Sequence, residues 1–194
     1  MPGGHRRLVL LTAVALGLAS LSGCGSSHAP VATTTAAPRA PAAGQGTLSA
    51  ELRRALPAFA RAPTAADAWT RDPSAFGGVR AGRLVATLGQ LRLYLLATGT
   101  SGTCLELPGY TGDCNDAPDF FGGSPVELLE AGPAVGAVLA PAVARVRLET
   151  PTGAVPVPLD ADRAVLFLCP HGSCAGDRLV GIGRNGRQLF GLAL

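Results

Sequence analysis

The chain has no lysine, and all 16 of its basic residues are arginine. Two of them, Arg6 and Arg7, belong to a leader that we expect to be removed. The formal charge of +3 therefore overstates the charge of the mature protein, which is near neutral. Nucleic-acid binding relies on a clustered basic face, and the remaining arginines show no such clustering along the sequence. We expect no nucleic-acid partner.

Motifs of several enzyme classes are also missing from the sequence. It has neither a phosphate-binding P-loop nor the Gly-x-Ser-x-Gly turn that presents the nucleophile of many hydrolases. The spacing Gly181-x-Gly183-x-x-Gly186 matches the glycines of a dinucleotide-binding turn. It falls on an expected hairpin rather than on a strand-to-helix turn, so we do not assign it. These observations favour a protein that is not an enzyme and uses no cofactor.

The first 23 residues have the organisation of a bacterial signal peptide. A charged start at positions 5–7 (His-Arg-Arg) precedes an apolar run over positions 8–21. This run has the length of a signal-peptide core and is too short to span a bilayer comfortably. It ends in the four residues Leu21-Ser22-Gly23-Cys24.

These four residues resemble the bacterial lipobox, where the lipoprotein signal peptidase cleaves before a cysteine that is then acylated. The resemblance implies that residues 1–23 are removed and that Cys24 carries a diacylglycerol. The protein would then be a lipoprotein on the extracytoplasmic face of the cell membrane, with the membrane as its first partner. Several acyl chains anchor firmly, whereas a single chain anchors only marginally. The alternative is an uncleaved membrane anchor that contains a cysteine by chance.

Residues 24–46 are mostly Ala, Pro, Thr, Ser and Gly, with almost no large apolar side chain. Such a segment cannot bury enough surface to offset the ordering of its backbone. Its prolines favour extended conformations. We expect a flexible tether that joins the lipidated cysteine to a folded domain of residues 47–194. The Thr33-Thr34-Thr35 run beside prolines leaves O-linked sugar open as an alternative role.

The folded domain begins with a predicted short helix over Thr47–Ala60. Its apolar residues recur at the spacing of one helical face, although Pro57 interrupts the segment. The stripe consists of Leu48, Leu52, Ala55, Leu56 and Phe59. Farther along, Trp69 is predicted to be a buried core side chain rather than a ligand platform.

Strands dominate the prediction after Arg83. Residues 91–97 alternate between two faces, residues 99–102 form a turn, and residues 103–107 return as a second strand. A half-buried strand is predicted over residues 144–149, where Ala144, Val146 and Leu148 alternate with charged residues. Further strands are predicted over residues 155–159, 164–168, 178–183 and 188–194. The whole pattern favours a mainly β domain, a small antiparallel sandwich or a barrel, with a short N-terminal helix.

Two local features refine the strand pattern. Pro156 and Pro158 lie two residues apart, so they remove hydrogen-bond donors from one side of their strand and predict an edge strand. Asn185-Gly186 predicts a two-residue hairpin turn of the primed type. Both devices are common in antiparallel sheets.

The second half of the chain resembles uncharacterised exported proteins of actinobacteria. The resemblance runs from about Leu91 to Leu194. It rests on a cysteine-bearing hairpin (Tyr94–Cys104), on the strand Val143-Ala144-Arg145-Val146-Arg147-Leu148, and on a glycine turn into Val155-Pro156-Val157. That group has no established activity, so the resemblance implies a style of fold and a location rather than a reaction.

Four cysteines remain besides the lipidated one: Cys104, Cys114, Cys169 and Cys174. An even number in an exported domain indicates disulfides, and four cysteines allow three connectivities. We favour the two local pairs, because each brackets a short loop. A zinc site with His171 and a redox pair at Cys169 and Cys174 are the alternatives. Their spacings match neither zinc ribbons nor redox dithiols.

An acidic segment contains Asp113, Asn115, Asp116 and Asp119. Its spacing differs from that of an EF-hand, so a solvated loop closed by a disulfide is favoured over a calcium site. Phe120 and Phe121 follow it. If buried, they close one end of the sheets, which is the favoured interpretation; if exposed, they are anchors for a partner.

His171 is the only histidine of the folded domain, and a hydrolytic triad would have to use it. Ser173 lies too near in sequence to assume a productive geometry, so a structural turn histidine is favoured.

We therefore expect a non-catalytic envelope module that binds a protein or a ligand. Its candidate contact surface is formed by the loops Leu107–Gly123 and Cys169–Cys174. Within these loops, the candidate contact residues are Asp116, Asp119, Phe120, Phe121 and His171. The alternatives are a small metal-dependent protein using His171 and the Asp113/Asp116/Asp119 loop, or a passive spacer.

Overall fold

The structure is a computed structural model that describes residues 48–71, 76–99, 101–115 and 123–194. The predicted signal peptide, the Cys24 lipidation site and all of the predicted tether lie outside the described residues. Among the residues that are described, no helix is long and apolar enough to cross a membrane.

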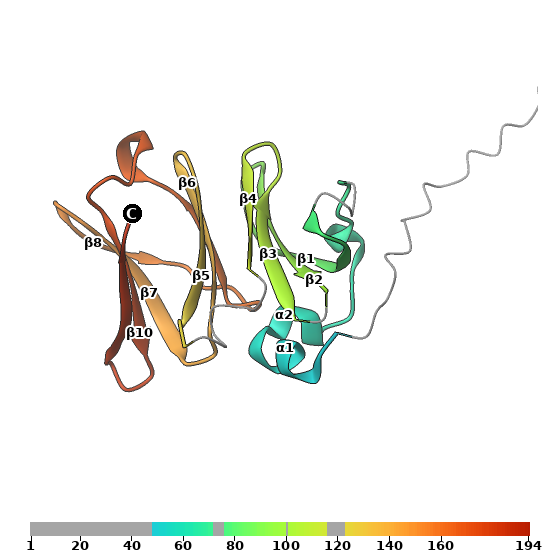
Figure 1. The fold of residues 1–194 in the computed structure, drawn as a ribbon. Helices are drawn as coiled ribbons and strands as arrows, with labels where there is room; N and C mark the ends of the chain where they lie inside the picture. The colour runs from blue at the N-terminus through green and yellow to red at the C-terminus, as the bar shows by residue number, and fades with distance from the viewer. Residues whose placement is uncertain (1–47, 72–75, 100, 116–122) are drawn as a thin grey trace, which may run out of the picture. The chain divides into compact units, whose positions relative to one another are not determined.

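Eleven strands form three antiparallel sheets within the described residues, so the predicted mainly β, sandwich-like fold is confirmed (Figure 1). The first sheet has the order β1-β2-β3-β4, the central sheet β5-β6-β9, and the third sheet β11-β10-β7-β8. The bounds are β1 Val79–Leu88, β2 Leu91–Thr98, β3 Gly102–Leu107, β4 Thr111–Asn115, β5 Val126–Ala131, β6 Ala134–Leu139, β7 Val143–Thr150, β8 Gly153–Val157, β9 Ala164–Leu168, β10 Arg178–Gly183 and β11 Gln188–Ala193.

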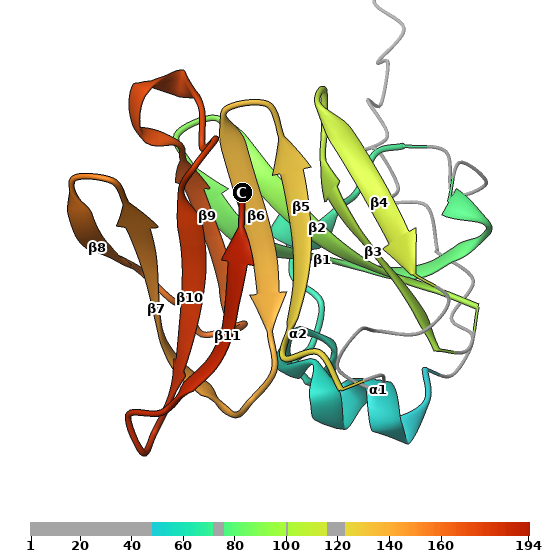
Figure 2. The ribbon, with the colours of Figure 1, turned by 60° about the vertical axis from the view of Figure 1, so that its left-hand side comes forward.

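The central sheet lies between the other two sheets and is buried on both faces (Figures 1 and 2). One core cluster joins it to the first sheet and the helices, through Leu93, Leu95 and Leu129 among others. A second cluster joins its other face to the third sheet, through Leu139 and Leu179 among others. All six residues of β6 are therefore buried. A sheet covered on both faces reads in sequence as a continuous apolar run without alternation.

Four strands were not predicted: β1, β4, β5 and β6. The β6 sequence, Ala-Val-Gly-Ala-Val-Leu, lacks the period-two signal because both of its faces pack against other layers. Its glycine, Gly136, allows the close approach of the first sheet. A Cβ there would lie 2.8 Å from Cδ1 of Leu93.

The predicted N-terminal helix is in fact two short helices, α1 (Ala50–Ala55) and α2 (Pro57–Ala60). The Ser49 side chain caps α1 by accepting a hydrogen bond of 3.0 Å from the Leu52 amide. The break occurs at Leu56, whose backbone is extended, and Pro57 begins the second helix at a position where proline is favourable. The predicted stripe holds: Leu52, Leu56 and Phe59 are buried.

The segment after the helices is fixed to β1 by an arginine–aspartate network. Arg61 binds Asp67 through two nitrogens, at 2.7 and 2.9 Å, and its Nε lies 2.9 Å from Asp162 in the β8–β9 connection. Asp67 also accepts hydrogen bonds from the Thr64 and Leu84 amides. Burial opposes the charge on Asp67, but hydrogen bonds from Arg61 and these amides outweigh it and hold the pKa of Asp67 well below its usual range.

The prediction of an edge strand is confirmed, but the strand spans Gly153–Val157 rather than residues 155–159, so it contains Pro156 and not Pro158. β8 is the last strand of the third sheet and pairs only with β7, where Pro156 lies opposite Arg147. The other side of β8 has no neighbouring strand in its sheet, so an N–H group missing on that side costs no hydrogen bond between strands. The strand is also protected from pairing with another chain.

The predicted primed turn at Asn185-Gly186 is wrong, although the hairpin itself is present. The Gly183 amide bonds to the Arg187 carbonyl at 2.9 Å, so the connection has three residues, Arg184 to Gly186. Only Gly186 has a positive φ, of 79°, whereas a primed type I turn needs positive φ at both central residues. The glycine takes the left-handed position of a three-residue hairpin loop instead.

Candidate binding site

Both local disulfides that the cysteine spacing favours are present. Cys104 and Cys114 lie opposite each other on β3 and β4, with sulfurs 2.06 Å apart. Cys169 and Cys174 close the connection between β9 and β10, with sulfurs 1.91 Å apart. The cysteines of the second pair pack with Val135 against the central sheet. All four cysteines are thus engaged in structural cross-links.

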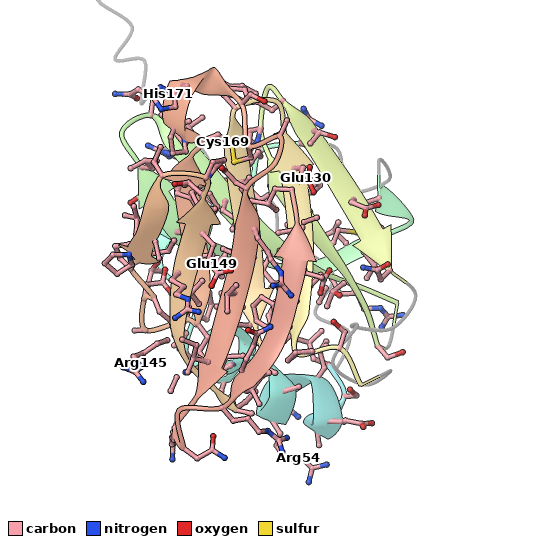
Figure 3. All side chains as sticks on the ribbon, turned by 90° about the vertical axis from the view of Figure 1, so that its left-hand side faces the viewer. Arg54, Glu130, Arg145, Glu149, Cys169 and His171 are labelled. Atoms are coloured by element: carbon pink, nitrogen blue, oxygen red, sulfur yellow. A yellow bond between two sulfur atoms is a disulfide. The ribbon has the colours of Figure 1, made fainter. Side chains whose placement is uncertain are left out.

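His171 is exposed at the tip of the second disulfide loop, in a short 3₁₀ turn, η4 (Pro170–Gly172) (Figure 3). Its backbone is in the left-handed region, with φ of 65°. The Ser173 Oγ accepts a hydrogen bond of 3.1 Å from the Ala175 amide, and no hydrogen bond joins Ser173 to His171 among the described residues. The turn is organised by its own backbone and by the disulfide.

The acidic segment is described only in part. Asp113 is exposed on β4 and accepts a hydrogen bond of 3.0 Å from the neighbouring Cys114 amide. Asp116, Asp119, Phe120 and Phe121 lie outside the described residues. Within the described ranges, no three His, Cys, Asp or Glu side chains gather closely enough to hold a metal ion.

A small pocket on the outward face of the first sheet was not predicted. Its volume is about 240 Å³, and it combines aromatic, cationic and amide side chains. Residues of three parts of the chain form it: the segment 61–71 that precedes β1, which we call the covering segment, the β1–β2 hairpin, and the β3–β4 turn. They are Ala68, Trp69, Thr70, Arg71, Gln90, Arg92, Tyr94 and Pro108. We call this the Trp69 pocket. Trp69 is half-buried rather than a full core residue, so the core prediction for this side chain is only partly right.

The pocket is built on a buried carboxylate, Glu106 of β3. Its side chain is fully buried and lies beside Tyr94, its partner on β2. The Trp69 indole Nε1 donates a hydrogen bond to Oε2 of Glu106. Arg71 Nε lies 2.9 Å from Oε1 of the same carboxylate, although at an angle that makes no hydrogen bond. A buried charge requires such partners, so Glu106 fixes two walls of the pocket.

Other side chains brace the same region. Trp69 packs against Phe76, with ring centroids 5.8 Å apart, over a small cluster that contains Tyr94 and Leu96. Gly82 lies beneath: a Cβ there would be 3.4 Å from the Trp69 Cβ. The tryptophan is therefore held from below, from the side and through its indole nitrogen.

A second concavity, of about 490 Å³, lies on the third sheet over β7 and β8. Arg145, Arg147, Pro156 and Ile182 contribute to it. Figure 3 shows Arg145 and Glu149 on this sheet. Arg147 bonds to Glu149 through Nε and Nη2, at 3.0 and 2.6 Å. Among the described residues, no buried charged side chain bonds to the residues that line it, whereas Glu106 contacts Trp69 and Arg71 of the other pocket. The Trp69 pocket is the better candidate site, because a buried group preorganises it.

The sequence contained one signal for this pocket, namely a single tryptophan close to arginines, but the signal is ambiguous without the fold. Glu106 carries no signal of its own, since an isolated glutamate in a strand is usually exposed. No family model, no curated protein and no solved structure matches the chain. The assignment therefore depends on the residues themselves.

Proposed function

We propose that this protein is a membrane-anchored extracytoplasmic lipoprotein whose β-rich domain is a non-catalytic binding module. Cys24 holds the lipid, residues 24–46 form the tether, and the Trp69 pocket receives a ligand. The signal-peptide pattern and the lipobox resemblance support the location. The preorganised pocket supports binding.

The observation that carries the location is the pair of disulfides, Cys104–Cys114 and Cys169–Cys174. Disulfides of this structural kind persist in oxidising compartments outside the cytoplasm. The disulfides and the signal-peptide pattern are two independent observations, and both support export.

The observation that supports binding is the arrangement around Glu106. A fully buried carboxylate positions an indole and a guanidinium at the rim of a concave surface. Ligand sites typically combine an apolar wall with a few polar groups that are fixed before the ligand arrives. Fixed groups lower the cost of ordering on binding.

The location is tested with Cys24→Ser in the full-length chain. The wild-type protein should fractionate with membranes and partition into detergent, and it should be digested by protease added outside the cytoplasmic membrane. The Cys24→Ser variant should lose lipid and leave the membrane fraction. Membrane retention of that variant, or protection of the wild type from external protease, would contradict the proposal.

A further inference from the structure

We propose that the Trp69 pocket binds a small ligand in which an anionic group is attached to a flat ring. The proposal rests on the proposed binding function and names the chemistry of the ligand. It follows from three features of the pocket: a fixed indole, an excess of positive charge, and a small volume.

The apolar wall of the pocket is aromatic and rigid. The Trp69 indole is oriented by its hydrogen bond to Glu106 and by its contact with Phe76. Tyr94 lies at the bottom, only 4% exposed, and Pro108 is at the rim. Aromatic surfaces favour planar partners in offset or edge-to-face contact, with ring centroids about 4.5–7 Å apart. A flat ring therefore fits this wall better than a branched aliphatic group.

The charged groups of the pocket favour an anion. Arg71 and Arg92 both contribute to its lining, and one carboxylate, Glu106, lies beneath them. Glu106 balances Arg71. Arg92 is exposed, and no described residue forms an ion pair or a side-chain hydrogen bond with its guanidinium. The described part of the pocket thus carries one guanidinium charge in excess.

A guanidinium presents paired N–H donors that match the two oxygens of a carboxylate or a phosphate. Arg71 contacts Glu106 through Nε, and no described residue accepts a hydrogen bond from its terminal nitrogens. Gln90 and Thr70 add uncharged polar groups to the lining. A cationic ligand would meet two guanidinium groups and is disfavoured.

The volume limits the ligand to a small one. About 240 Å³ is below the range of drug-sized sites, which is about 300–1,000 Å³. One ring with its acid group is the expected size. A carboxylate and a phosphate can both supply the anionic oxygens that a guanidinium binds. Titration with benzoate and with phenyl phosphate distinguishes the two.

The chain itself provides a single reporter for this pocket. Trp69 is the only tryptophan, so a ¹H–¹⁵N spectrum contains one indole N–H signal, and it comes from the pocket wall. The mature lipid-anchored protein in detergent micelles is titrated with benzoate, with phenyl phosphate and with benzamide. Benzamide has nearly the same shape as benzoate and no charge.

We expect a saturable shift of the Trp69 indole signal with benzoate or phenyl phosphate, and binding of benzamide at least about tenfold weaker. Arg92→Gln should weaken binding of the anion about tenfold and leave the affinity for benzamide unchanged. Arg187→Gln, at the exposed β10–β11 turn, is the matched control and should change neither affinity. The spectrum outside the pocket reports whether each variant is folded.

Equal affinity for benzoate and benzamide, or an unchanged anion affinity in Arg92→Gln, would overturn the proposal. So would the absence of a saturable shift with either anion at tens of millimolar. Equal affinity for benzoate and benzamide would leave the pocket a binding site and overturn only its preference for an anion. The absence of any shift would also count against binding in this pocket, whereas lipidation and membrane location are read separately from the Cys24→Ser fractionation.

Discussion

The two outer sheets of the domain differ in what covers their outward faces. Both pack one face against the central sheet. The other face of the first sheet is covered by the segment that carries Trp69, with Glu106 buried below that segment and Asp67 buried within it. The third sheet presents Arg145, Arg147 and other polar side chains on its outward face.

This difference separates two uses of charged residues. Beneath and within the covering segment, the carboxylates Glu106 and Asp67 are buried, paired and geometrically fixed, so they define a pocket and hold the segment in place. On the third sheet, which we call the open sheet, charged side chains are solvent-exposed, and their ion pairs contribute little to the free energy of unfolding. Substitutions at comparable residues of the two sheets should therefore have effects of very different size.

The largest contrast is expected between Asp67→Ala and Glu149→Ala. The Asp67 side chain is 3% exposed, and its removal leaves the Arg61 guanidinium and two backbone amides without their acceptor. We expect a loss of about 3 kcal/mol in the free energy of unfolding, measured in urea. Glu149→Ala also breaks an arginine pair, but at 32% exposure it should cost no more than about 0.5 kcal/mol. Similar losses in both variants would remove the distinction.

Asp67 also gives a prediction about the dependence of stability on pH. The pKa of Asp67 is lower in the folded protein than in the unfolded chain. Its contribution to stability is therefore fully present above the unfolded value of about 3.9 and is lost as the pH falls through the folded value. The stability difference between wild type and Asp67→Asn should be constant near neutrality and should shrink below about pH 4, as measured by urea unfolding at each pH.

The two disulfides should differ in how much each contributes to the free energy of unfolding. Replacing Cys104 and Cys114 together by alanine should cost about 3 kcal/mol, and replacing Cys169 and Cys174 about 2 kcal/mol, because the first pair closes the longer loop. The first change should also disturb the Trp69 indole signal, since Cys104 packs in the same cluster as Tyr94 and Leu96. An unchanged indole signal would argue against that coupling.

Two glycines provide a matched test of packing. At Gly136, a Cβ would lie 2.8 Å from the fully buried Leu93, so Gly136→Ala should cost about 1–3 kcal/mol. At Gly191 on the third sheet, the nearest obstacles are guanidinium atoms of Arg178, an exposed and flexible side chain. Gly191→Ala should therefore be milder. Leu93→Val should recover part of the Gly136→Ala loss, and a lack of recovery would contradict the stated cause.

The smallest effect is expected for Arg147→Ala on the open sheet. Its side chain is 43% exposed, and among the described residues it pairs only with Glu149 on its own strand. The change in unfolding free energy should stay within about 0.5 kcal/mol. A larger loss would show that the third sheet has a cover or a partner that makes this arginine structural.

The open sheet was also the easier one to predict from sequence. Along β7, buried Val146 and Leu148 alternate with more exposed Arg145 and Arg147, so the period-two pattern is visible. β6 gives no such signal because both faces are buried, and β4 is short and polar. The sequence therefore indicated a β-rich sandwich but not a third layer.

The candidate site was predicted least well. The cysteine pairs followed from loop length, whereas the Trp69 pocket depends on Glu106, which is 35 residues beyond Arg71 in the chain. Such a pairing arises from the position of the covering segment over β2 and β3, and no local pattern specifies it. Asp113 and His171, which were predicted from residue type, are exposed and organised by neighbouring backbone or by a disulfide.

The most direct test is peptide mapping by mass spectrometry, with metal analysis, of the mature protein purified from membranes without reductant. We expect a diacylglycerol on Cys24, intact Cys104–Cys114 and Cys169–Cys174 disulfides, and no stoichiometric metal. An unmodified Cys24 in an uncleaved chain, or free thiols with stoichiometric zinc, would contradict it and would make His171 and its neighbours the place to look for function.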